Sequence, residues 1–117
     1  MTQQAVVERR TVVRTSVEVP VVCQRVHARG ADSAWTGATE DLSGAGMAAL
    51  LEPGESPAGV GDVIEADLTI NGDRVCVRAL VVAAETTDGR VRVRCAFAQT
   101  GTEEPRALIA RFCEQLS

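Results

Sequence analysis

Apolar and polar residues alternate over much of the chain, which is the pattern of β-strands with one buried face. The first alternating segment runs from Ser16 to Val26. It contains Pro20, whose backbone nitrogen carries no hydrogen for a ladder, so we expect an edge position or a bulge there.

Four further segments are predicted as strands, and tight turns connect the last three. These segments are Ala34–Leu42, Asp62–Ile70, Arg74–Glu85 and Arg90–Ala98. The dipeptides Asn71-Gly72 and Asp88-Gly89 are strong signals for two-residue hairpins. The last three strands are therefore expected to form a meander.

Arginines recur on the outward face of this meander. They are Arg74, Arg78, Arg90, Arg92 and Arg94. Such a stripe could extend a ligand site, or it could be a solvated strand face that prevents edge pairing.

The C-terminal segment is predicted to be an amphipathic helix. Thr102 is a good N-cap, and Glu103 and Glu104 suit the first turn. Its apolar stripe comprises Leu108, Ile109, Phe112, Cys113 and Leu116. This stripe is expected to cover an open end of the sheet, although it could instead dock on a partner.

Length and composition predict one compact domain. The chain has 117 residues, of which 45% are hydrophobic and 3% aromatic. A core built mainly from Val, Leu, Ile and Ala suits a small β-barrel. We expect a flexible lead over residues 1–8 and a single domain over residues 9–117, with the adjoining arginine run becoming ordered when a ligand binds.

The net charge of −4 argues against a nucleic-acid polymer as partner, because such partners favour a surplus of positive charge. All twelve basic residues are Arg, and three of them lie within Arg9–Arg14. Coding bias in the genome could explain the absence of Lys. The local cluster on an acidic protein nevertheless fits a small anionic ligand.

Several other classes of function lack support in the sequence. No signal peptide is visible, and the longest apolar run, Ala79–Ala84, is too short for membrane insertion, so we expect a cytoplasmic protein. His27 is the only histidine, and no catalytic triad, phosphate loop or cofactor motif surrounds it. We therefore predict no catalytic residues, no enzyme activity and no cofactor. The cysteines Cys23, Cys76, Cys95 and Cys113 form no metal or redox motif and are expected to be buried thiols.

Arg10 and Arg14 lie four residues apart around a β-branched run that favours extended backbone. In a strand they would share a face roughly 13 Å apart. Two guanidinium groups at that separation could converge on one ligand with two phosphates, or stack on its bases. They could also belong to a solvated arm.

The segment Asp41–Gly46 offers complementary chemistry for a base. In a strand, Asp41 and Ser43 would point outward while Leu42 points into the core. Two carboxylate oxygens can accept from the two adjacent N–H donors of a guanine edge. Gly44 and Gly46 can adopt positive φ and let a flat ligand approach the backbone.

The order R-x-x-x-R followed by D-x-S-x-x-G resembles the PilZ domain family, the bacterial receptors for cyclic di-GMP (c-di-GMP), over roughly residues 8–116. The resemblance implies a mostly β fold, a six-stranded antiparallel PilZ-type β-barrel with a C-terminal α-helix. It assigns Arg10 and Arg14 to the phosphates and to stacking on guanine. It assigns the guanine edge to Asp41, Ser43 and Gly46, with Arg9 as a further contact.

Two local alternatives remain. Ser43 could cap a helix over residues 44–52, which Ala and Leu content favours, whereas the resemblance implies a strand over Met47–Leu51. Trp35 could stack on a guanine, but core packing is the expected role.

The resemblance implies a stand-alone c-di-GMP receptor that signals by contact with an unidentified downstream protein. The alternative is a structural adapter module of the same fold that does not bind nucleotide.

Overall fold

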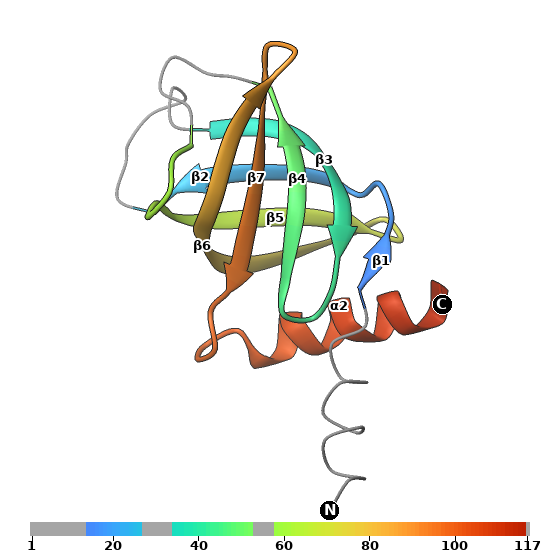
Figure 1. The fold of residues 1–117 in the computed structure, drawn as a ribbon. Helices are drawn as coiled ribbons and strands as arrows, with labels where there is room; N and C mark the ends of the chain where they lie inside the picture. The colour runs from blue at the N-terminus through green and yellow to red at the C-terminus, as the bar shows by residue number, and fades with distance from the viewer. Residues whose placement is uncertain (1–13, 27–33, 53–57, 117) are drawn as a thin grey trace, which may run out of the picture.

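A computed structural model describes residues 14–26, 34–52 and 58–116 (Figure 1). The described part of the chain is mostly β, with seven strands and a C-terminal helix. They are β1 (Thr15–Ser16), β2 (Pro20–Arg25), β3 (Ala34–Leu42), β4 (Gly46–Leu51), β5 (Val63–Ile70), β6 (Asp73–Thr87), β7 (Arg90–Phe97) and α2 (Glu103–Leu116).

Six strands form a closed antiparallel barrel in the order β3-β2-β5-β6-β7-β4, and β4 pairs back onto β3. The short strand β1 adds to the end of β3. The hairpins lie where the sequence predicts them, with Asn71-Gly72 and Asp88-Gly89 all at positive φ. The predicted six-stranded barrel with a C-terminal helix is thus confirmed.

The first predicted strand is interrupted. Residues 17–19 separate β1 from β2, and Thr39 of β3, which is fully buried, holds them in place. Its hydroxyl accepts from the Val19 amide at 2.9 Å and donates to the Val17 carbonyl oxygen at 2.5 Å. Pro20 begins β2, and β2 lies between β3 and β5. The prediction that Pro20 lies in an edge strand is therefore wrong. The break between β1 and β2 accommodates the proline instead.

Strand β4 replaces the helix that local propensity favours. Its residues pair with β3 on one side and β7 on the other, while Met47, Ala49 and Leu51 enter the core. Pairing on both edges closes the barrel and outweighs the modest helix preference of Ala and Leu. The strand prediction is confirmed and the helix alternative is wrong.

The core is aliphatic, with Trp35 at 2% exposure packed inside it. The Trp35 ring also lies 5.0 Å below the Arg25 guanidinium, so its predicted core role is confirmed. Burial raises the pKa of the Cys23 and Cys95 thiols to about 12. Cys76 is exposed on the outer face of β6, so the expectation of burial was wrong for this one thiol.

Helix α2 lies across one end of the barrel, beside β1 and the β3–β4 turn (Figure 1). Ile109 and Cys113 are buried, whereas Leu108 and Leu116 are about half exposed, so the buried stripe is narrower than predicted. The Cys113 thiol donates to the Leu42 carbonyl oxygen at 3.3 Å. The helix therefore supports the end of β3 directly.

Some sequence predictions fall on residues outside the described ranges. These are the flexible lead 1–8, Arg9, Arg10 and His27. Within the described ranges, no helix is both long enough and apolar enough to cross a membrane. The same residues contain no group of three or more His, Cys, Asp or Glu side chains that could hold a metal ion.

Candidate functional site

A hollow of about 200 Å³ on the outer wall brings parts of both sequence motifs together. Arg14, Asp41, Ser43 and Gly46 all line it, while Arg9 and Arg10 lie outside the described residues. Ligand pockets are usually larger, about 300–1,000 Å³, so this hollow suits one part of a ligand, such as a single base.

The floor of the hollow was not predicted from the sequence. Ala48, Val82 and Ala96 contribute apolar surface from three strands, β4, β6 and β7. Their meeting depends on the register between distant segments. The sequence predicts only one part of this arrangement, because the Asp88-Gly89 hairpin places β6 beside β7.

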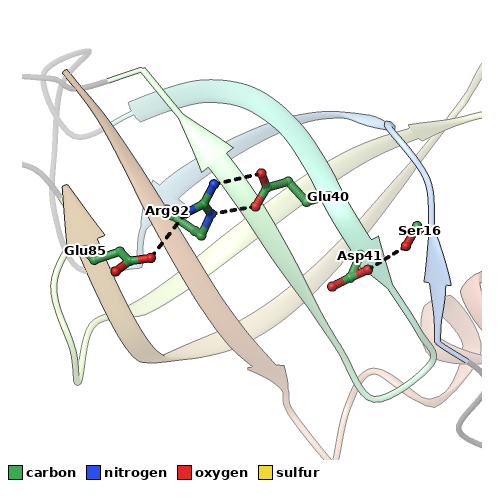
Figure 2. A network of polar contacts seen from close by, with 5 residues as sticks. All are labelled: Ser16, Glu40, Asp41, Glu85 and Arg92. Carbon is green, nitrogen blue, oxygen red and sulfur yellow. Dashed lines mark hydrogen bonds and ion pairs between the residues drawn. The ribbon is translucent and has the colours of Figure 1, made fainter. Parts of the chain in front are cut away.

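A β-bulge in β3 aims Asp41 outward. The register shifts between Thr39 and Asp41, so two residues of β3 face Ala48 alone. As a result Thr39 and Leu42 are both buried, while Glu40 and Asp41 are both half exposed. The Ser16 hydroxyl donates to Asp41 Oδ1 at 3.1 Å (Figure 2). Each carboxylate oxygen can accept more than one hydrogen bond, so both oxygens can still accept from a ligand.

Ser43 does not face outward with Asp41, as the alternation predicted. It is buried, with 6% exposure, and its side chain folds back into the β3–β4 turn. Its hydroxyl oxygen accepts from the Ala45 and Gly46 amides at 3.1 and 3.2 Å. The Ser43 amide in turn donates to the Gly46 carbonyl oxygen at 2.9 Å. Ser43 therefore fixes the shape of the turn beside Asp41.

The glycines of the turn serve a different purpose from the one expected. Neither Gly44 nor Gly46 has positive φ, so that expectation was wrong. A Cβ at Gly46 would lie 2.2 Å from the Cys95 carbonyl oxygen, and one at Gly44 would lie 2.9 Å from the Ala110 Cβ. The turn needs glycine because β7 and α2 approach its backbone closely.

Helix α2 also holds the turn in place. Arg106 Nε donates to the Gly44 carbonyl oxygen at 3.2 Å, and Arg106 Nη1 donates to the Gln99 carbonyl oxygen at 3.1 Å. Thr15 Oγ1 donates to the Cys113 carbonyl oxygen at 3.3 Å. The same helix thus contacts both β1, which follows Arg14, and the turn that follows Asp41.

Beside the hollow, Arg92 bridges two carboxylates (Figure 2). It pairs with both oxygens of Glu40, at 2.8 and 3.2 Å, and with Glu85 at 3.2 Å. This guanidinium lowers the pKa of the Glu40 carboxyl from its ordinary value of 4.5. Because the planar guanidinium binds Glu40 through two parallel hydrogen bonds, Arg92 is already paired within the protein.

Three other outward arginines also form ion pairs. The pairs are Arg74 with Asp67 at 3.2 Å, Arg78 with Glu65 at 3.4 Å and Arg90 with Glu52 at 3.8 Å. For these residues the arrangement favours the solvated strand face over a ligand site. Arg94 differs, because it lines the hollow and has no ion pair within the described residues.

Replacing Arg92 with glutamine should make stability less sensitive to acid. Because Glu40 has a lowered pKa in the folded state, the unfolded chain binds more protons near pH 4, and the ion pair stabilises the fold only above that range. Unfolding free energy, measured in urea from pH 7 to pH 3, should therefore fall less in Arg92→Gln than in the native protein. Glu40→Gln should flatten the profile equally. An unchanged slope in both variants would contradict this account.

The PilZ domain family model matches residues 8–115. The fold is similar to that of the Bacillus subtilis inhibitor of motility MotI/DgrA, with 15% identity and a TM-score of 0.70, over 92% of this chain and 50% of that protein. The chain thus spans about half the length of MotI. No curated protein matches it.

Two isolated PilZ domains match along almost their whole length. The YcgR domain from Escherichia coli, solved with c-di-GMP, is 21% identical with a TM-score of 0.66, over 92% of this chain and 91% of that one. The CeSA domain from a cellulose-synthesizing bacterium is 17% identical with a TM-score of 0.63, over 88% and 96%. Such identities establish the fold, and the family match extends over nearly the whole sequence. The chain therefore belongs to the PilZ domain family.

Proposed function

We propose that the chain is a receptor for c-di-GMP that signals by contact with a downstream protein, without catalysis. The observation that carries this proposal is the shared hollow. Arg14, from the R-x-x-x-R motif, lines the same surface as Asp41 and Gly46 from the D-x-S-x-x-G motif. The YcgR domain, which has a similar fold, was solved with c-di-GMP, and this ligand offers the chemistry that these side chains suit.

Asp41 is proposed to bind the guanine edge. Its half-exposed carboxylate can accept from the adjacent N1–H and N2–H donors, which adenine does not present. Gly46 lines the hollow at the turn, and Val82 and Ala96 offer apolar surface to the face of the ring. Ser43 contributes by fixing the turn, since its hydroxyl already accepts two amide hydrogen bonds.

The arginines are proposed to bind the phosphates and to stack on guanine. Arg14 is exposed and lies two residues before Ser16, which donates to Asp41. Its planar fork can bind a phosphate bidentately. Arg10 is assigned the second such contact and Arg9 an additional one, both upstream of the described residues.

Signalling is proposed to run through β1. Ligand held by both Arg14 and Asp41 would join β1 more firmly to β3, and Thr15 connects β1 to the end of α2. The surface where β1 meets α2 would then differ between the free and the ligand-bound protein. A partner that binds at this surface would have different affinities for the two states.

Replacing Arg14 with alanine should weaken c-di-GMP binding by about one to two decades, because a charge-assisted contact is worth roughly 1.5–3 kcal/mol. Isothermal titration calorimetry would measure the dissociation constant, with Arg111→Ala as the control. Arg111 is exposed on α2 and does not line the hollow. If Arg14→Ala and the native protein had equal affinity, Arg14 would not be a ligand-binding residue. Absence of binding by the native protein would favour the adapter module.

A further inference from the structure

One row of paired residues crosses the outer wall through the hollow. Asp41 of β3 is opposite Ala48 of β4, Ala48 is opposite Arg94 of β7, and Arg94 is opposite Ala83 of β6. Neighbouring strands lie about 4.8 Å apart, so the Cα atoms of Asp41 and Arg94 are separated by roughly 10 Å. Only the small side chain of Ala48 stands between them.

Both register shifts found in the described sheet lie on this row. One falls in β3 between Thr39 and Asp41, and the other falls in β6 between Val81 and Ala83. The second bulge leaves Val82 beside Arg94 with 46% exposure. Bulges redirect side chains and are frequent next to functional sites. One bulge therefore lies next to Asp41, and the other lies opposite Arg94.

Arg94 also lies where two hollows meet. It lines the hollow that contains Arg14 and Asp41, and it lines a second one of about 260 Å³ floored by Ala83 and Ala84. Its guanidinium has no ion-pair partner within the described part of the chain, whereas Arg92, two residues earlier, pairs with two carboxylates. Arg94 therefore presents an uncompensated fork of donors on an open surface.

We propose that Arg94 is a ligand-binding residue, and that it binds a phosphate of the same cyclic dinucleotide whose guanine contacts Asp41. This inference rests on the proposed function. The row offers an acceptor at Asp41, a small apolar spacer at Ala48 and a cation at Arg94. A ligand with base donors at one end and an anion at the other matches that order. Arg94 thus acts from β7, while Arg14 acts from the opposite side of Asp41.

Isothermal titration of the full chain with c-di-GMP tests this inference. Arg94→Gln should weaken binding about tenfold and should make the affinity less dependent on salt concentration, because one cation–phosphate contact is lost. Arg78→Gln is the matched control. It removes an arginine from a strand face, where the side chain is 52% exposed and already paired with Glu65. Urea unfolding of both variants should match the native protein.

The possible results separate this inference from the proposed function. If the native protein binds, Arg14→Ala weakens binding and Arg94→Gln binds like the native protein, then Arg94 is not a ligand contact and the receptor proposal stands. If Arg94→Gln and Arg78→Gln weaken binding equally, the effect is general electrostatics and the inference fails. If the native protein does not bind c-di-GMP, the receptor proposal and this inference fail together.

Discussion

Asp41→Ala is expected to weaken c-di-GMP binding by at least about two decades. The carboxylate is proposed to accept two hydrogen bonds from the guanine edge, each worth roughly 1.5–3 kcal/mol when the acceptor is charged. Stability should change little, because the half-exposed side chain has one hydrogen bond, from Ser16, within the described residues. Calorimetry would give the affinity and urea unfolding the stability.

Two further variants sharpen the Asp41 test. Asp41→Asn keeps one carbonyl oxygen but turns N–H donors toward guanine donors, so it should lose most of the preference for c-di-GMP over cyclic di-AMP. Asp73→Ala removes an exposed carboxylate at the start of β6, outside the hollow, and should bind as the native protein does. Native affinity in Asp41→Ala would show that the guanine edge binds elsewhere.

Gly46→Ala is expected to lower the unfolding free energy by about 3 kcal/mol and to abolish measurable binding. The added Cβ would lie 2.2 Å from the Cys95 carbonyl oxygen, a backbone atom that cannot move without opening the pairing of β4 with β7. That pairing both closes the barrel and shapes the hollow. Chemical denaturation, followed by the fluorescence of Trp35, would measure the loss.

Gly59→Ala is the matched control for this steric argument. A Cβ at Gly59 meets nothing closer than Asp62 Oδ2 at 4.0 Å, so the same chemical change should leave stability nearly unchanged. If the two variants had equal unfolding free energies, close approach of β7 would not be the reason for glycine at position 46.

Local chemistry was sufficient to predict the two hairpins, most of the strands and the helix, whereas the closed six-stranded barrel was implied by the family resemblance. The dipeptides Asn71-Gly72 and Asp88-Gly89 specify their hairpins, since each supplies two residues at positive φ. The alternation around Val21 and Cys23 correctly predicts which side chains are buried. Strand β4 was different: propensity favoured a helix, and the resemblance to a known family gave the correct answer. Its strand conformation depends on pairing with β3 and β7, which short-range signals do not encode.

The site was less predictable because it depends on two bulges. Simple alternation places Ser43 on the same face as Asp41, but the turn draws its hydroxyl toward the amides of Ala45 and Gly46. Arg94 resembled the other outward arginines in the sequence. Its position opposite Ala48 follows only from the register of β4 and β7, because Ala48 and Arg94 lie more than forty residues apart in the chain. Motif spacing finds Asp41 and Arg14, whereas the spatial partners of these residues require the folded barrel.

The most direct test of the receptor proposal is a calorimetric titration of the full chain with c-di-GMP at physiological salt, compared with cyclic di-AMP and GMP. We expect saturable binding of c-di-GMP and much weaker binding of both controls, because Asp41 is proposed to bind the guanine edge and the arginines are proposed to bind more than one phosphate. Equal binding of c-di-GMP and cyclic di-AMP, or no binding at high ligand concentration, would contradict the account.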